Sequence, residues 1–228
     1  MQTRKLGSLN VSVIGLGCNN FGGRLDLAGT KNVLDAAIDA GVTFMDTADT
    51  YGATKSESLM GEVLKGRRDQ VVLATKFGMA NQAGGIVGGA TPDYIRSSID
   101  GSLQRLQTDH VDLYQLHRPH DDVPIADTLG ALKELVDAGK VIEIGCSNFS
   151  TQQLEEAEAI SRQHGWPRFV SVQNEYSMLR REPEAGVLAT CRRLGVAFLP
   201  YFPLFSGILT GKYRRGLPLP AGTRVTSN

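Results

Sequence analysis

The sequence predicts an α/β fold built on a parallel β-sheet, and two observations support this. Six short runs of Val, Ile, Leu and Phe alternate with stretches that have the period of amphipathic helices. The apolar residues of each run are nearly continuous, which is typical of strands buried on both faces in a parallel sheet covered by helices. Two architectures fit this order, an open doubly wound sheet and a (β/α)8 barrel.

The predicted strands follow one another regularly along the chain. The first element is a β-hairpin, in which Thr3–Leu6 pairs with Val11–Ile14 around a turn at Ser8–Asn10. The six sheet strands are Thr43–Asp46, Val71–Lys76, Val111–His117, Val141–Ser147, Val170–Gln173 and Val196–Tyr201. No linker rich in Pro, Gly and Ser divides them, so residues 1–228 are predicted to form a single domain.

Helices are predicted between these strands, and several carry signals at their ends. Thr30 can cap a helix that closes near Gly41, and Thr91–Pro92 combines a cap with proline at the first helical position. The other three helices are expected near Ala126–Ala138, Thr151–His164 and Glu184–Leu194. The glycine-rich stretch Gly78–Ala90 is expected to be a loop after the second sheet strand.

Composition and charge exclude several classes of protein. The 228 residues include 24 Lys and Arg against 24 Asp and Glu, so neither nucleic acid nor an acidic membrane surface is an expected partner. No apolar run reaches the roughly 20 residues of a membrane span, and the N-terminus lacks the apolar core of a secretory signal. Three widely spaced cysteines, Cys18, Cys146 and Cys191, predict reduced thiols and a cytoplasmic protein.

Polar side chains end all six predicted sheet strands. They are Asp46, Lys76, His117, Ser147 with Asn148, Gln173 and Tyr201. In a parallel sheet the carboxyl ends of the strands lie on one side, which is where such folds place their chemistry. Each residue alone has an ordinary structural explanation, but together they predict one polar pocket.

Four of these groups suit the protonation of a developing alkoxide. Tyr51 follows Asp46 closely enough for the loop to return its phenol to the strand end. An ammonium from Lys76 at about 4 Å would lower the phenol pKa through an attraction on the order of 4 kcal/mol, before desolvation takes back a share. Asp46 would orient that lysine, and His117 would donate a hydrogen bond to the substrate oxygen.

A reduction of this kind needs a hydride donor. Ser147, Asn148 and Gln173 offer hydroxyl and amide groups suited to a carboxamide such as that of nicotinamide, and Tyr201 could stack on a flat ring. No metal is expected, because His117 and His120 lack further ligands at suitable spacing. Gly15, Gly17 and Gly22 do not have the spacing of a dinucleotide fingerprint, although Asn19 or Asn20 could lie near a cofactor.

These segments resemble the aldo-keto reductase family. AGVTFMDTADTYG, with Glu57 and Gly61 downstream, resembles the first family signature, and LATKFG and DLYQLH resemble the segments with its lysine and histidine. IGCSNF, the Gln173 segment and YFPLFSGILTGKY resemble its cofactor-binding segments. The later segments are most similar to the branch with bacterial general reductases and potassium-channel β subunits.

The resemblance implies a (β/α)8 barrel whose bottom is plugged by the N-terminal hairpin, and NADPH-dependent reduction of aldehydes or ketones without metal. It implies that Tyr51 is the general acid, that Lys76 and Asp46 tune it, and that His117 orients the carbonyl. The implied nicotinamide contacts are Ser147, Asn148, Gln173 and Tyr201. The implied pyrophosphate contacts are Leu204, Ser206, Gly207, Leu209 and Lys212, with Arg224 as a further contact to a cofactor phosphate.

The six predicted strands fall short of the family barrel. The sequence therefore predicts a barrel that lacks its last one or two β-α units, with residues 1–228 as a C-terminally incomplete domain. The choice of NADP over NAD rests on the resemblance alone. Two alternatives to an active reductase remain, a cofactor-binding, redox-sensing regulatory subunit of the same fold and an inactive remnant. A homo-oligomer is left open, and the physiological carbonyl substrate is not predicted.

Overall fold

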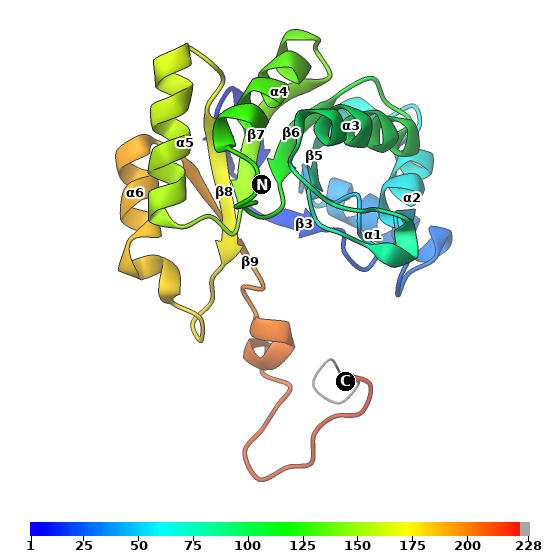
Figure 1. The fold of residues 1–228 in the computed structure, drawn as a ribbon. Helices are drawn as coiled ribbons and strands as arrows, with labels where there is room; N and C mark the ends of the chain where they lie inside the picture. The colour runs from blue at the N-terminus through cyan, green and yellow to red at the C-terminus, as the bar shows by residue number, and fades with distance from the viewer. Residues whose placement is uncertain (224–228) are drawn as a thin grey trace.

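A seven-stranded parallel sheet forms the centre of the computed structural model, which describes residues 1–223 (Figure 1). Its strands pair in chain order: β3 (Gly15–Gly17), β4 (Phe44–Asp46), β5 (Val72–Phe77), β6 (Val111–Leu116), β7 (Val141–Ser147), β8 (Phe169–Glu175) and β9 (Ala197–Tyr201). Every neighbouring pair is parallel. This strand order and direction confirm the α/β class with a parallel sheet.

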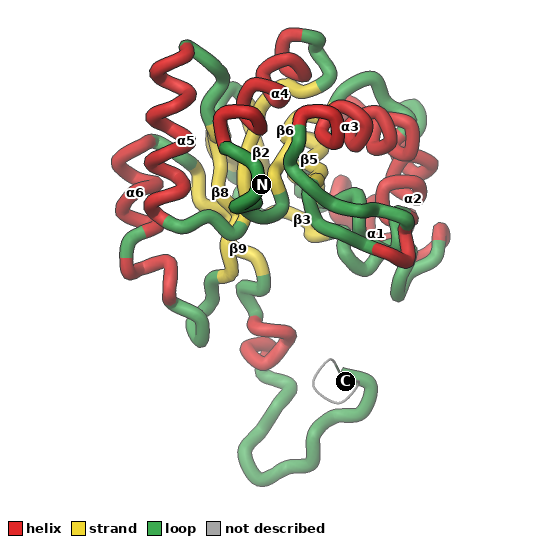
Figure 2. The backbone as a smooth tube through the Cα atoms, viewed as in Figure 1, coloured by secondary structure: helices red, strands yellow, loops and turns green. Residues whose placement is uncertain are grey.

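Helices form the outer layer of this curled sheet. They are α1 (Leu27–Asp39), α2 (Lys55–Leu64), α3 (Pro92–Leu106), α4 (Ile125–Asp137), α5 (Thr151–His164) and α6 (Val187–Leu194). Short 3-10 turns are η1 (Arg68–Gln70), η2 (Gln82–Gly84), η3 (Glu182–Ala185) and η4 (Phe205–Thr210). The helices follow the curve of the sheet on its outside (Figure 2), as in a (β/α)8 barrel and unlike a doubly wound sheet with helices on both faces.

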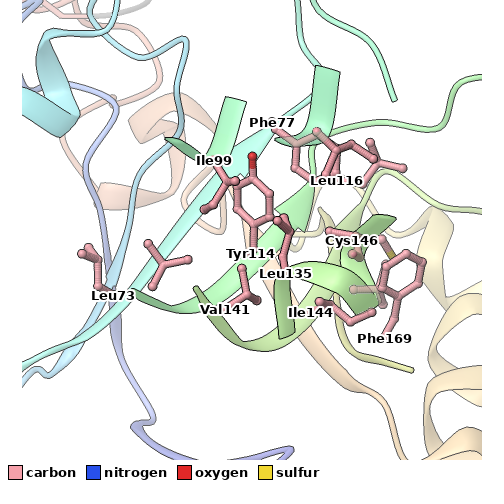
Figure 3. Close-up of a cluster of buried hydrophobic side chains, with 14 of the residues drawn as sticks. Leu73, Phe77, Ile99, Tyr114, Leu116, Leu135, Val141, Ile144, Cys146 and Phe169 are labelled. Atoms are coloured by element: carbon pink, nitrogen blue, oxygen red, sulfur yellow. The ribbon is translucent and has the colours of Figure 1, made fainter. Parts of the chain in front are cut away.

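Two separate hydrophobic clusters confirm this one-sided arrangement. The outer cluster joins strand residues such as Leu73, Tyr114 and Ile144 to helix residues such as Ile99 and Leu135 (Figure 3). Alternate strand residues point to the opposite face, because side chains in a strand alternate with a period of two. The chain therefore has an interior between its strands as well as a core beneath its helices.

The inner cluster is closed by the N-terminal hairpin, which consists of β1 (Thr3–Leu6) and β2 (Leu9–Ser12). Its apolar members are Leu6, Leu9 and Val11 of the hairpin with Phe44, Ala74 and Leu113 of the sheet. All six are buried, so the hairpin seals the amino-terminal end of the strand interior. This confirms the predicted hairpin as the plug at the bottom of the sheet.

The predicted turn of that hairpin is wrong by two residues. Leu6 pairs with Leu9, so the turn is Gly7–Ser8 and the second strand begins earlier than Val11. Gly7 has a φ of +59°, and a Cβ there would lie 2.5 Å from the Glu143 carboxylate. The turn therefore requires glycine, which the placement of the turn at Ser8–Asn10 did not use.

The sheet has seven strands rather than six because Gly15–Gly17 is also a strand. It pairs with β4, and Gly15 lies opposite Phe44. A Cβ on Gly15 would meet the Phe44 ring at 2.7 Å, so the close pairing depends on a residue without a side chain. A three-residue strand with two glycines has no apolar run, and composition therefore gives no signal for it.

Helix α2 was not predicted either, because it too lacks a continuous apolar pattern. Ser56 and Glu57 in its first turn are fully buried, so its inner face is not apolar throughout. Glu57 is satisfied there by Thr75 and by an ion pair of 2.7 Å with Arg105. By contrast, α5 spans Thr151–His164 as predicted, and it begins with a capping box between Ser150 and Gln153.

No helix within residues 1–223 combines the length and apolar character needed to cross a bilayer. All three cysteines are buried and unpaired with one another.

Candidate active site

The carboxyl ends of the strands converge on one cavity of about 360 Å³. Seven of the predicted residues line it: Asp46, Tyr51, His117, Ser147, Asn148, Gln173 and Tyr201. Six of them lie at or near the ends of β4, β6, β7, β8 and β9 or directly after these strands, and Tyr51 lies in the loop after β4. The strand register explains the convergence. Ser147 lies opposite Gln173 on the neighbouring strand, so their side chains point to the same face of the sheet, and this face lines the cavity.

Lys76 does not line the cavity but is completely buried against two residues that do, Asp46 and Tyr51. Its Nζ is 2.6 Å from Asp46 Oδ2, 2.9 Å from the Thr47 carbonyl oxygen and 3.3 Å from the Tyr51 hydroxyl. Burial lowers the pKa of Lys76, but the charge of Asp46 and the contact with Tyr51 outweigh it and leave this pKa above its ordinary value. The lysine is therefore a buried ammonium held between a carboxylate and a phenol.

Gln115 completes the support of this ion pair. Its Nε2 donates to Asp46 Oδ1 at 3.0 Å, while Lys76 contacts the other carboxylate oxygen. Gln115 was not predicted as a site residue, although a signal was available. It lies two residues before His117 on β6 and opposite Lys76 on β5, so it had to share their face of the sheet.

The loop after β4 brings Tyr51 to the lysine. The Thr47 and Asp49 amides donate to the carbonyl oxygens of Ala74 and Lys76, so the loop continues to pair with β5 beyond the end of its strand. Gly52 then turns the chain with a φ of +57°, and a Cβ there would lie 2.4 Å from a backbone oxygen. The position of the phenol is thus fixed by backbone hydrogen bonds on one side and by a required glycine on the other.

The pKa of Tyr51 moves in the direction opposite to the prediction. Burial raises it, and the nearby Lys76 ammonium lowers it by less, so the net pKa lies above the ordinary value for tyrosine. The predicted lowering is wrong because desolvation of the phenolate exceeds the attraction of an ammonium whose charge Asp46 already balances. In the structure described, Tyr51 is therefore a protonated phenol.

His117 lies beside this phenol and lines the same cavity. The two rings meet edge to face with centroids 5.9 Å apart. Burial, together with the positive charges of Lys76 and Arg118, lowers the pKa of His117 to about 3, so the imidazole is neutral at pH 7. Its Nδ1 is buried without a hydrogen-bond partner among the residues described. A neutral ring with unused hydrogen-bonding capacity is suited to bind an uncharged polar group.

The predicted amide-binding residues differ in how much of their bonding capacity remains. Asn148 donates to the His117 carbonyl oxygen at 2.9 Å and accepts from the Tyr201 hydroxyl at 2.8 Å, so both ends of its amide are already bonded. Ser147 donates to the Gln173 carbonyl oxygen at 2.7 Å. The side-chain amide of Gln173 has no such bond within residues 1–223 and lines the cavity. Among these three side chains, Gln173 therefore has the most hydrogen-bonding capacity left for a carboxamide.

A second cavity of about 380 Å³ adjoins the first, since Asn19 and Phe202 line both. Four of the predicted pyrophosphate residues line it: Leu204, Ser206, Gly207 and Lys212. Leu209 belongs to the same turn η4 but does not line the cavity, and Arg224 lies outside the described residues.

Two positively charged side chains line this second cavity. Arg24 lines it together with Lys212, whose Nζ would lie 2.9 Å from a Cβ on Gly207. Ser206 and Gly207 both adopt positive φ, so the turn presents backbone rather than side chain at this point. Within residues 1–223 neither cation makes an ion pair, and exposed backbone beside such cations is suited to bind phosphate oxygens.

No cluster of three or more His, Cys, Asp or Glu side chains that could hold a metal occurs among the described residues. His120, the second histidine of the HRPH segment, instead bonds to the Gly78 carbonyl oxygen at 2.7 Å.

Comparison with known proteins adds independent information. Residues 13–228 match the profile of the Aldo/keto reductase family. The chain is 39% identical over 210 residues to aldo-keto reductase YhdN of Bacillus subtilis, covering 90% of this chain and 62% of that protein. It is 38% identical over 220 residues to probable aldo-keto reductase 1 of Glycine max, covering 93% and 62%.

A third relative is aldo-keto reductase yakc of Schizosaccharomyces pombe, whose name specifies NADP(+). The identity is 38% over 230 residues, with 96% of this chain and 66% of that protein covered. The chain thus spans less than two thirds of the length of each of these relatives.

Proposed function

The chain belongs to the aldo/keto reductase family, and from this premise we propose that it reduces aldehydes or ketones to alcohols with NADPH. The observation that carries the proposal is the contact of Lys76 Nζ with both Asp46 and the Tyr51 hydroxyl, beside a cavity that His117 also lines. These residues lie far apart in the sequence, and the fold brings a proton donor and a charge that stabilises its conjugate base to one point.

NADPH bound across the two cavities would supply a hydride to the carbonyl carbon. Gln173 would bind the nicotinamide carboxamide with its free side-chain amide, and Ser147 would accept a hydrogen bond from the same group. Tyr201, held by its bond to Asn148, would present its ring to the nicotinamide. Arg24 and Lys212 would contact phosphate oxygens in the second cavity. The relative whose name specifies NADP(+) supports the choice of cofactor.

In this proposal Tyr51 donates the proton. As the carbonyl oxygen gains charge, the neutral His117 ring donates a hydrogen bond to it and the Tyr51 hydroxyl releases its proton to it, giving the alcohol. The raised pKa of Tyr51 keeps the phenol protonated until that moment. Lys76, only 3.3 Å away, then stabilises the tyrosinate, which recovers a proton from solvent.

The substitution Tyr51→Phe tests this assignment. It removes the proton and keeps the ring, so NADPH binding measured by fluorescence titration should change little, while aldehyde turnover should fall by about 10²-fold or more. Retention of more than about a tenth of wild-type turnover on several aldehydes would show that Tyr51 is not the acid. Tyr176→Phe is the matched control, because its hydroxyl bonds to Glu184 on the surface.

The same assay addresses the regulatory alternative. A protein that binds NADPH but reduces none of a panel of aldehydes and ketones would act as a cofactor-binding subunit, and the proposal of a reductase would be wrong.

A further inference from the structure

The active-site cavity contains one charge that nothing in the site balances. Asp46 and Arg118 are its charged lining residues within the described chain, and Asp46 is neutralised by Lys76 at 2.6 Å. Tyr51 is protonated and His117 is neutral at pH 7. The guanidinium of Arg118 therefore gives the cavity a net positive charge.

Arg118 faces the site rather than open solvent alone. Arg118 lines the same cavity as His117 and Tyr201. Arg118 directly follows His117, so its backbone is held by the bond from the His117 amide to the Phe77 carbonyl oxygen. The residue is exposed to solvent and also lines the cavity.

The nearby carboxylates are directed elsewhere. Asp122 lies 3.8 Å from His120 Nδ1, and Asp121 lines a different cavity. Glu175 lies 3.7 Å from Arg180. Within residues 1–223 the guanidinium of Arg118 makes no ion pair or side-chain hydrogen bond, so its donors are available to a ligand.

The cofactor phosphates do not explain this arginine. Arg24 and Lys212 lie in the second cavity, where the phosphates are proposed to bind, whereas Arg118 lines the cavity of Tyr51 and His117. A guanidinium beside the reacting carbonyl matches a carboxylate, since its planar donors can bind both carboxylate oxygens at once.

We propose that Arg118 binds a carboxylate on the substrate, so that the preferred substrates are aldehydes or ketones that carry an anionic group. This inference rests on the proposed reductase function and names its substrate class. Arg118 is a specificity residue in this scheme, because it contacts a part of the substrate that does not react.

The test compares 4-formylbenzoate with its methyl ester, which differ in charge and share the reacting aldehyde. The ratio of kcat/KM for the acid to that for the ester is measured in the wild type and in Arg118→Gln. The ratio should fall about tenfold in the variant, more than a fully exposed ion pair gives and less than a buried one. Any effect of Arg118 on His117 acts on both aldehydes and cancels in the ratio.

Two further variants sharpen the result. Arg118→Lys keeps the positive charge but lacks the planar guanidinium that can bind both carboxylate oxygens. It should therefore retain part of the preference for the acid over the ester. Arg192→Gln on α6 removes one positive charge from a surface that does not line the cavity, and it should leave the ratio unchanged. If the ratio in Arg118→Gln stays within about twofold of the wild type, the inference is wrong while the reductase function stands.

Binding separates the two proposals if turnover is absent. A wild type that reduces neither aldehyde contradicts the reductase function. Calorimetric titration with 4-(hydroxymethyl)benzoate and its methyl ester then still tests Arg118. Arg118→Gln should weaken binding of the acid about tenfold and leave that of the ester unaffected. Equal binding of acid and ester by the wild type overturns the inference.

Discussion

Replacing Asp49 with Asn should remove a large part of the dependence of stability on pH. Asp49 is fully buried in the loop that carries Tyr51, on the side facing α2 and α3. Its Oδ1 has no hydrogen-bond partner among the described residues, and its Oδ2 is 3.4 Å from the Ser98 hydroxyl. Burial, with a smaller contribution from Glu57, raises the pKa of this carboxyl from 3.8 to about 7.

The sign follows from where the proton is bound. With a raised pKa in the folded state, Asp49 keeps a proton between about pH 4 and pH 7 that the unfolded chain releases. Stability therefore falls as the pH rises through this window and is lowest above it. Near pH 5, two units below the folded pKa, the bound proton stabilises the folded state by about 2.7 kcal/mol relative to pH 9.

His117 acts in the opposite direction over much of the same range. Its pKa of about 3 in the folded protein lies below its ordinary value of 6.5, so the unfolded chain takes up a proton first as the pH falls. The contribution of His117 is present above about pH 6.5 and is lost toward pH 3. The two effects oppose each other in the wild-type curve, so the difference between variant and wild type is needed to isolate Asp49.

The assay is urea unfolding followed by circular dichroism, with wild type and Asp49→Asn measured from about pH 5 to pH 9. The free energy of unfolding of the variant minus that of the wild type should be about 2.7 kcal/mol more positive at pH 9 than at pH 5, because only the wild type loses the stabilising proton. The substitution Asp121→Asn at an exposed position controls for the change in net charge. A difference that varies by less than about 0.5 kcal/mol across the range refutes the reasoning.

Two further predictions concern the site and its scaffold. Lys76→Met removes a fully buried ammonium and leaves Asp46, whose side chain is 14% exposed, without its charge partner. Unfolding should become about 3 kcal/mol easier in urea, and aldehyde turnover should fall at least as far as in Tyr51→Phe, with a shifted pH profile. An unchanged profile in the folded variant would contradict the role of Lys76. Gly61→Ala should destabilise by about 1 to 3 kcal/mol, because its Cβ would lie 2.4 Å from a backbone oxygen of α3. Gly130→Ala on α4 is its control, since that Cβ would meet only the Trp166 ring, at an ordinary contact distance of 3.5 Å, and equal stability of the two variants would contradict the argument.

The sequence was sufficient to predict the site wherever strand periodicity determined it. Asp46, Lys76 and His117 end strands with clear apolar runs, and the parallel sheet then requires their side chains to meet. Elements without an apolar run could not be found this way. Strand β3 depends on Gly15, and α2 hides a buried ion pair beneath its first turn.

The electrostatics of the site were less predictable than its position. The sequence places Lys76 near Tyr51, which suggests a lower phenol pKa, but the sign depends on how deeply the phenol is buried and on how fully Asp46 balances the lysine. Burial is a property of the whole fold and has no local signature. For the same reason, the sequence could not show that His117 Nδ1 and the Arg118 guanidinium have no hydrogen-bond partner among residues 1–223.

The interior of the sheet is divided into two layers along each strand, and this division explains how one short element serves both stability and chemistry. On β5, Ala74 packs against the hairpin while Lys76, two residues later, holds Asp46 and Tyr51. On β6, Leu113 and Gln115 repeat the pattern. A register slip of one residue would turn both layers outward together. The apolar layer sealed by the hairpin therefore fixes the register, and through it the distance between the ammonium and the phenol.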